Sequence, residues 1–267
     1  MGTRILTAII ALALVVPILV WGGVPGLTLL GSFAVGVCMV EYEGMSRVMR
    51  GPLSRGWHIA AALAIFLSIQ TLNAPLILLV GALVVVGTFF LYLLKFDTIE
   101  SVAAGWAYSV AGLFYAPFLL SFVVLLRARE FGLAWIALLM IVTWAGDSGA
   151  YFAGRAFGKH KLYPEVSPKK TWEGLFGGVV LSVVGAFVAR ATFFPQLSVV
   201  DCLLLAPVAD LAGVAGDLCE SLLKRASGVK DSGTILPGHG GMLDRLDSLF
   251  FSAPVVFGYA VFIFQRV

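Results

Sequence analysis

The chain has 267 residues, of which 60% are hydrophobic and 12% are charged, and its formal net charge is +3. A soluble domain of this length carries about 25% charged residues, so the composition excludes a soluble globular protein and places the chain in a lipid bilayer. The cysteines, Cys38, Cys202 and Cys219, all lie in apolar runs without a Cys-x-x-Cys pair. This pattern predicts small hydrophobic side chains, and neither a disulfide nor a metal framework.

Nine apolar stretches are long enough, or nearly long enough, to cross a bilayer as helices, which takes about 20 residues. We therefore expect an all-α, polytopic integral membrane protein with about nine transmembrane helices. The first stretch resembles a signal peptide, but no small-residue cleavage site stands out, so a retained helix is expected. The stretches are residues 5–21, 24–42, 57–73, 74–94, 102–126, 131–153, 174–193, 198–219 and 249–265.

These helices are expected to form one integrated membrane domain, with residues 1–130 as its N-terminal part and residues 131–267 as the part that carries the long polar loops. With the N-terminus placed in the cytoplasm, fourteen of the eighteen lysines and arginines lie on the cytoplasmic side of the nine spans. This is a strong positive-inside bias. It puts both long polar loops, residues 154–173 and 220–248, on the cytoplasmic face.

Carboxylates occur in the predicted spans, where each costs at least about 2.5 kcal/mol to insert and therefore usually marks a function. Asp147 lies at the inner end of the sixth span, and Asp210, Asp217 and Glu220 lie in the eighth or at its end. The spacing of these three acids and Lys224 places them in one stripe of a helix. Clustered carboxylates suit a hard cation such as Mg²⁺. Ion pairs that hold helices together, or an ion pathway, would use the same residues.

The loop before the seventh span contains the run Ser167-Pro168-Lys169-Lys170-Thr171. Pro168 is typical of a helix start, and Ser167 is typical of an N-cap. Free N–H groups at a helix N-terminus and two lysines would form an anion site that favours phosphate. Anchoring of the two lysines to lipid head groups is the alternative.

The second loop contains the run KDSGTILPGHGGMLDRLD over residues 230–247. Its glycines, Gly240 and Gly241 among them, let the backbone turn sharply and approach a ligand. Asp244 and Asp247 are spaced to share a helix face, and His239 can bind phosphate, donate a proton or hydrogen-bond its own loop. Carboxylates for a metal and cations for phosphates are the components of phosphoryl or nucleotidyl transfer. The nearby cations are Lys224, Arg225, Lys230 and Arg245.

The run from Ser221 to Asp247 resembles the signature of the phosphatidate cytidylyltransferases, also called CDP-diacylglycerol synthases. The similar parts are Ser-x-x-Lys-Arg at 221–225, Lys-Asp at 230–231, Pro-Gly-His-Gly-Gly at 237–241 and Asp-Arg-x-Asp at 244–247. Asp147, Ala150 and Tyr151, with the later run SPKKTWEG, are also similar to that family. The resemblance is close over the C-terminal half, whereas the N-terminal half is similar only in being a run of apolar helices.

This resemblance implies an enzyme of phospholipid biosynthesis that joins CTP and phosphatidic acid into CDP-diacylglycerol and releases pyrophosphate. It implies a requirement for Mg²⁺, with a second cation as a candidate helper. The expected location is the bacterial inner membrane, with the active site on the cytoplasmic face. The bilayer is an expected partner, a homodimer is a candidate assembly, and no nucleic acid partner is expected.

The resemblance also assigns roles to individual residues. The expected metal ligands are Asp217 and Asp244, together with Asp147 and Glu220. The expected catalytic residues are Asp217, Asp244, Lys224, Arg225 and His239. The expected substrate-binding residues are Ser167, Lys169, Lys170, Thr171, Lys230, Asp231, Gly240, Gly241, Arg245 and Asp247.

Two other functions use the same kinds of residue. One is a CTP-dependent lipid kinase or a related transferase that acts on a different lipid phosphate or alcohol. The other is a cation- or proton-coupled transporter that uses the acids of the sixth and eighth spans. A transporter does not explain why the polar residues are concentrated in loops on the inner side.

Overall fold

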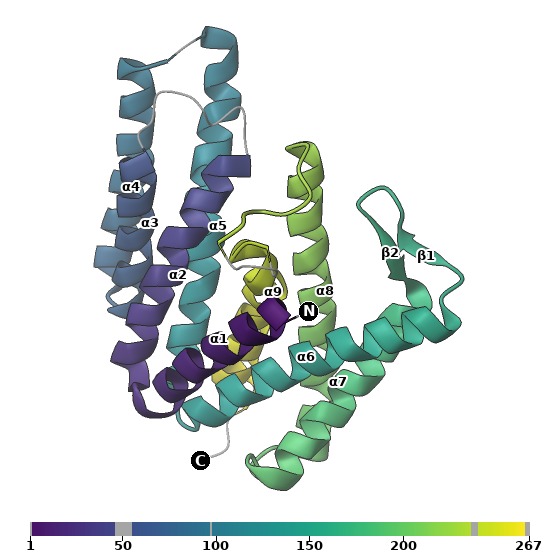
Figure 1. Cartoon of the computed structure of the whole chain (residues 1–267). Helices are drawn as coiled ribbons and strands as arrows, with labels where there is room; N and C mark the ends of the chain where they lie inside the picture. The colour runs from purple at the N-terminus through teal and green to yellow at the C-terminus, as the bar shows by residue number, and fades with distance from the viewer. Residues whose placement is uncertain (1, 46–54, 97, 236–239, 265–267) are drawn as a thin grey trace. The chain divides into compact units, whose positions relative to one another are not determined.

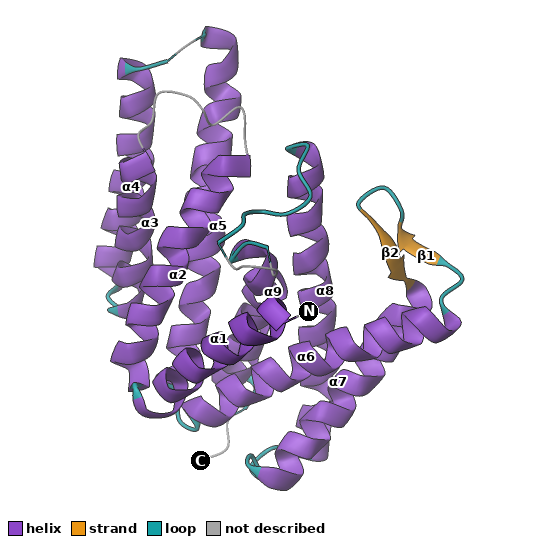
Figure 2. Ribbon diagram, viewed as in Figure 1, coloured by secondary structure: helices purple, strands orange, loops and turns teal. Residues whose placement is uncertain are grey.

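The computed structural model describes residues 2–45, 55–96, 98–235 and 240–264 (Figure 1). Within these ranges the chain is almost wholly helical, and its strands form one short hairpin (Figure 2). The predicted all-α fold is therefore confirmed. The chain forms two compact units, Met1–Val124 with Ala226–Arg245, and Leu125–Arg225 with Leu246–Val267.

The first unit is a bundle of long apolar helices. Tyr42 on α2 and Tyr108 on α5 stack with 4.4 Å between ring centroids, and each hydroxyl donates to the other residue's backbone carbonyl. Trp57 Nε1 on α3 donates to Thr88 Oγ1 on α4 at 3.1 Å. The helices are α1 (Gly2–Trp21), α2 (Gly23–Met45), α3 (Arg55–Gln70), α4 (Ala74–Leu94) and α5 (Ile99–Arg127), which reaches the unit boundary.

A buried histidine links three helices of this bundle. His58 is 1% exposed, its Nδ1 lies 2.5 Å from Glu43 Oε1, and its Nε2 lies 3.3 Å from Ser109 Oγ. The Ser109 hydroxyl in turn lies 3.2 Å from the hydroxyl of Tyr92. A polar group in an apolar interior is tolerated when it has hydrogen-bond partners. This series of hydrogen bonds therefore provides partners for the polar side chains of α2, α3, α4 and α5.

The second unit contains α6 (Gly132–Phe157), β1 (Lys161–Tyr163), β2 (Ser167–Thr171), α7 (Trp172–Thr192), nearly all of α8 (Val199–Ala226) and most of α9 (Leu243–Phe262). Small residues let α6 and α7 approach closely: a Cβ on Gly177 would lie 2.2 Å from the Cβ of Ala153. The start of α8 is tied to α9 because Asp201 Oδ1 accepts from the Tyr259 hydroxyl at 2.8 Å.

The helices follow the predicted order, and α4 has the predicted bounds. The ends of the other helices differ from the predicted spans, and two differences are the largest: α8 ends at Ala226 rather than at 219, and α9 begins at Leu243 rather than at 249. Both extensions are polar, so a search for apolar runs stops before them. Lys224, Arg225 and Asp244 are consequently helical residues.

Among the described residues, seven helices are long and apolar enough to cross a membrane: α2, α4, α5, α6, α7, α8 and α9. The prediction of a polytopic membrane protein is confirmed, and the total of nine spans stays a prediction. The three cysteines are free, with Cys38 and Cys202 buried and Cys219 exposed.

Candidate active site

The residues predicted to start the seventh helix form a β-strand instead. In β2, Ser167 pairs with Tyr163 and Thr171 pairs with Lys161 of the antiparallel β1. The N-cap of α7 is Thr171, whose Oγ1 accepts from the N–H of Gly174 at 3.1 Å. The prediction of Ser167 as the N-cap and Pro168 as the helix start is therefore wrong. A proline needs no N–H partner, so it is also tolerated at an open edge of a two-stranded ribbon.

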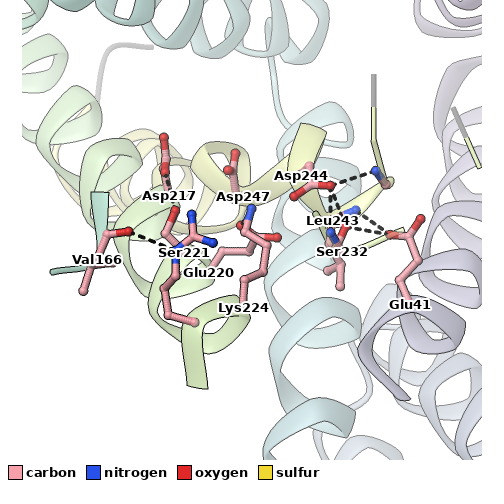
Figure 3. A network of polar contacts seen from close by, with 12 residues as sticks. Glu41, Val166, Asp217, Glu220, Ser221, Lys224, Ser232, Leu243, Asp244 and Asp247 are labelled. Atoms are coloured by element: carbon pink, nitrogen blue, oxygen red, sulfur yellow. Dashed lines mark hydrogen bonds and ion pairs between the residues drawn. The ribbon is translucent and has the colours of Figure 1, made fainter. Parts of the chain in front are cut away.

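The hairpin is attached to the end of α8 by two contacts between predicted site residues and their neighbours. Lys170 Nζ in β2 lies 2.9 Å from Asp217 Oδ2, and both side chains are partly exposed, at 23% and 31%. Arg225 Nε donates to the backbone carbonyl of Val166 at 3.4 Å (Figure 3). The adjacent Lys169 is exposed. The structure thus brings Lys170 to Asp217 and leaves Lys169 at the surface.

The predicted stripe of polar residues on α8 is confirmed. Asp210, Glu220 and Lys224 are buried along one side of the helix, and Asp217 is partly exposed between them. Glu220 and Lys224 form an ion pair one turn apart. The Ser221 hydroxyl donates to Asp217 Oδ1 at 3.2 Å (Figure 3). Each end of the Asp217 carboxylate therefore has a partner, one a cation and the other a hydroxyl.

Asp210 lies in a space that two glycines provide. It is 4% exposed, and its Oδ2 atom has no hydrogen-bond partner in the described part of the structure. A Cβ on Gly146 of α6 would lie 1.7 Å from Asp210 Oδ1, and a Cβ on Gly178 of α7 would lie 3.3 Å from Oδ2. The next residue on α6 is Asp147, which is exposed. The carboxylate of Asp210 thus occupies the contact between α6, α7 and α8.

Asp247 lies where α8 and α9 pack closely. A Cβ on Gly216 would lie 2.4 Å from the backbone carbonyl oxygen of Asp247, so the helix backbones nearly touch there. Asp247 Oδ1 accepts from the N–H of Ser248 at 2.6 Å. In Figure 3 the carboxylates of Asp217 and Asp247 point to the same side of the two helices.

In the first unit, Asp244 organises the loop that precedes α9. Its Oδ2 atom accepts from the N–H and the hydroxyl of Ser232, at 3.0 and 2.9 Å, and from the N–H of Gly241 at 2.8 Å (Figure 3). Gly240 has a φ of 83°, which a residue with a side chain rarely adopts. Asp244, predicted as a metal ligand, is thus also a structural residue of its loop.

The sequence reasoning missed Glu41, which takes part in the same network. Its carboxylate accepts from the N–H of Met242 at 2.9 Å. It also accepts from the N–H of Leu243 at 2.9 Å (Figure 3). The available signal was the acid itself, because a carboxylate at the end of an apolar span marks a function by default. The remaining predicted residues Lys230, Asp231 and Arg245 are exposed, and His239 lies outside the described residues.

The carboxylates fit an open magnesium site better than an enclosed one. Over the described ranges, no three Asp, Glu, His or Cys side chains gather closely enough to hold a metal ion. Mg²⁺ usually takes one or two carboxylates and completes its shell with waters and substrate phosphates. Asp217, partly exposed, and Asp247, on the helix packed against it, are donors of that kind.

Comparison with known proteins places the chain in a family. A model of the cytidylyltransferase family matches residues 2–263. The phosphatidate cytidylyltransferase of Brucella suis is 39% identical over 260 residues, which cover 96% of this chain and 91% of that protein. The protein of the same name from Staphylococcus epidermidis is 34% identical over 262 residues, with 96% and 97% covered. That from Haemophilus influenzae is 47% identical over 135 residues, with 49% and 46% covered. With a match across almost its entire length, the chain belongs to the cytidylyltransferase family.

Proposed function

We propose that the chain transfers the cytidylyl group of CTP to phosphatidic acid, giving CDP-diacylglycerol and pyrophosphate. The full-length relatives from Brucella suis and Staphylococcus epidermidis, both called phosphatidate cytidylyltransferase, support this reaction. The contact of Lys170 with Asp217 is the observation that supports a particular site for this reaction. It joins a cation suited to phosphate with a carboxylate suited to a metal, on the two segments that the sequence singled out.

The reaction needs no general base to start. A phosphomonoester has a second pKa of about 6, so phosphatidic acid is already largely ionised at neutral pH. One of its phosphate oxygens attacks the α-phosphorus of CTP. A new phosphorus–oxygen bond forms, and the bond from the α-phosphorus to the oxygen bridging to the β-phosphate breaks. Pyrophosphate carries away the electron pair of that bond.

The main barrier is electrostatic, because two polyanions must approach each other. In our proposal Lys170 exchanges Asp217 for a substrate phosphate, and Arg225, held at the hairpin by Val166, adds positive charge beside it. Mg²⁺ would be held by Asp217 and Asp247, with Asp244 as a further ligand predicted from the family resemblance alone, and would neutralise charge on the phosphate oxygens. A role for a second cation stays a prediction.

The place of the reaction is also part of the proposal. The excess of lysine and arginine on one side of the predicted spans supports a site on the cytoplasmic face of a bacterial inner membrane. There CTP arrives from water and the lipid from the bilayer. A homodimer stays a prediction.

Labelled CTP tests the reaction with purified protein in detergent, phosphatidic acid and Mg²⁺. Label at the α-phosphate is expected to enter the lipid fraction, and label at the γ-phosphate is expected to stay in water. Transfer of the γ-label would identify a lipid kinase instead. Transfer of neither label, with ion flux in liposomes, would identify a transporter.

A further inference from the structure

We infer that Glu41, in the N-terminal half of the chain, is a positioning residue for the signature loop in the C-terminal half. The loop is defined here by its described residues, 227–235 and 240–242, between α8 and α9. This inference deepens the proposed function and rests on it for the activity measurements alone. All the residues that carry it belong to the first compact unit.

Glu41 is buried at 6% exposure near the end of α2, and its carboxylate is fully engaged (Figure 3). Oε1 accepts from the N–H of Met242 at 2.9 Å. Oε2 accepts from the N–H of Leu243 at 2.9 Å and lies 3.3 Å from the hydroxyl of Ser232. A buried carboxylate is tolerated only when it is hydrogen-bonded in this way, so the position of the loop and the charge on Glu41 depend on each other.

These contacts fall at the start of α9, where backbone N–H groups have no partner within the helix. Negative charge is favourable at that end because of the helix dipole. Glu41 supplies the charge from another helix, whereas Asp244 supplies it from within α9 and binds the N–H groups of Ser232 and Gly241. The hydroxyl of Ser232 lies within hydrogen-bond distance of both carboxylates. Glu41 and Asp244 together therefore hold Ser232, in the middle of the loop, against the residues at its α9 end.

Two glycines of the loop are explained by the side chain of Glu41. The three atoms nearest to a Cβ on Gly233 would all belong to Glu41, with Oε1 at 2.6 Å. A Cβ on Gly241 would lie 2.7 Å from Glu41 Oε2 and 2.0 Å from the hydroxyl oxygen of Ser232. A side chain at either position would push Glu41 or Ser232 away. Both positions therefore require glycine because the Glu41 carboxylate of α2 occupies the space beside them. The loop sequence alone does not reveal this reason.

The proposed consequence is that Glu41 acts through the loop and not on the substrates. It holds the turn at Gly240 and Gly241 and the first residues of α9, and so sets the orientation of Asp244. Loss of Glu41 should then change turnover more than the affinity for CTP, because the loop still forms but samples several positions.

A double-mutant cycle with Gly233 tests this inference. Gly233→Ala alone is expected to lower kcat about 10-fold or more, as is Glu41→Ala alone, since each removes the hydrogen bonds of a charged group. The double variant is expected to be no worse than Glu41→Ala, because the added methyl group then occupies the vacated space. Multiplying effects, with the double variant about 100-fold or more below the wild type, would overturn the inference.

Hydrogen exchange gives a readout that does not depend on activity. In Glu41→Ala the amides of Met242 and Leu243 are expected to exchange at least about 10-fold faster, while those of α4 keep their wild-type rates. Unchanged exchange at both amides would contradict the inference. Glu41→Gln serves if the alanine variant does not fold, because its NH₂ group must face the N–H of either Met242 or Leu243, and the amide that it faces should exchange faster.

Glu43→Gln is the matched control, since Glu43 lies on the same helix and pairs with Arg55 and His58 instead. It should leave the exchange of Met242 and Leu243 unchanged, and faster exchange at both amides in this control would overturn the specific role of Glu41. Gly44→Ala controls for the glycine change, because a Cβ there would meet no atom within 4 Å. If the wild-type protein transfers no cytidylyl group, the proposed function fails, and the exchange rates still decide the role of Glu41.

Discussion

Lys170 Nζ lies 2.9 Å from Asp217 Oδ2, so a lysine of the β-hairpin compensates the charge of a carboxylate on α8. From the sequence, Lys170 was predicted to bind phosphate and Asp217 was predicted to bind a metal ion. Their contact means that either ligand has to compete with an existing ion pair. Both side chains are partly exposed, which makes this exchange feasible.

Lys170→Ala should therefore impair the enzyme much more than Lys169→Ala. The first change removes the partner of Asp217 and a cation for the substrate, with an expected loss of about 10-fold or more in kcat/KM. The second removes an exposed lysine of the same strand, with an expected change of less than about 3-fold. Steady-state kinetics at varied CTP and lipid measure both. Equal losses in the two variants would return Lys170 to a role in lipid anchoring.

Asp217→Asn should abolish nearly all cytidylyl transfer without loss of folded protein, because the carboxylate is partly exposed and the hairpin keeps its second contact with α8, from Arg225 to Val166. The matched change at the other end of α8 is Asp201→Asn. Asp201 accepts from the N–H of Ser198 and the hydroxyl of Tyr259. Asp201→Asn should therefore lower the free energy of unfolding by about 1 kcal/mol, and the variant should retain most of its activity. Size-exclusion profiles and turnover per folded protein separate the two effects. Wild-type turnover in Asp217→Asn would refute the assigned role.

Asp244→Asn is harder to interpret than the sequence indicates. Because Asp244 Oδ2 accepts three hydrogen bonds from the loop, its replacement disturbs the backbone as well as any metal site. Loss of activity in this variant therefore does not identify a metal ligand, and Asp217 is the better position for that test.

The order and approximate positions of the helices could be predicted because long apolar runs are the main requirement for crossing a bilayer. The stripe on α8 could be predicted because Asp210, Asp217 and Glu220 follow the helical repeat. The polar ends of α8 and α9 could not, since apolar runs do not mark a helix that continues into a polar segment. The glycines and charged residues of the signature loop indicated a substrate site, but they did not indicate which residues elsewhere in the chain hold the loop in place.

Other features depend on contacts between residues far apart in the chain. Glu41 meets the loop only through the packing of α2, and His58 finds Glu43 and Ser109 only within the folded bundle. The hairpin was missed because Ser167 and Pro168 suit both a helix start and a strand. Thr171, directly before the helix, was the better cap, and this choice has a measurable consequence.

Thr171→Ala should destabilise the protein by about 1 kcal/mol, the usual effect of losing an N-cap hydrogen bond, here the one to Gly174. Ser167→Ala should have little effect on stability, because Ser167 lies in β2 and caps no helix. Thermal unfolding in detergent, followed by the helical circular dichroism signal, compares the variants. A larger loss for Ser167→Ala would restore the original assignment of the helix start.

Gly146→Ala should destabilise the contact of α6 with α8, because its methyl group would lie 1.7 Å from Asp210 Oδ1. Overpacking of this kind costs about 1–3 kcal/mol. Removing the carboxylate with Asp210→Ala should recover most of this loss. Gly36→Ala on α2 is the control, since its Cβ would meet no atom within 4 Å. The same thermal unfolding measurement applies, and full stability of Gly146→Ala would show that Asp210 does not fill this space.

Cysteine labelling in intact and permeabilised cells tests the predicted membrane topology. In a background without Cys38, Cys202 and Cys219, a cysteine replacing Lys159 should react with an impermeant maleimide only after permeabilisation, and one replacing Arg129 should react in intact cells. Both positions are exposed. The positive-inside bias predicts this result. Labelling of Lys159→Cys in intact cells would place the hairpin on the outer face.

The central claim is that a lipid phosphate displaces pyrophosphate from CTP at the site where the hairpin meets α8. The most direct measurement follows α-labelled CTP and pyrophosphate together, with purified protein, phosphatidic acid and Mg²⁺. The account predicts one pyrophosphate released for each label that enters the lipid, with both signals lost in Asp217→Asn. Release of inorganic phosphate in place of pyrophosphate, or label transfer that persists in that variant, would contradict it.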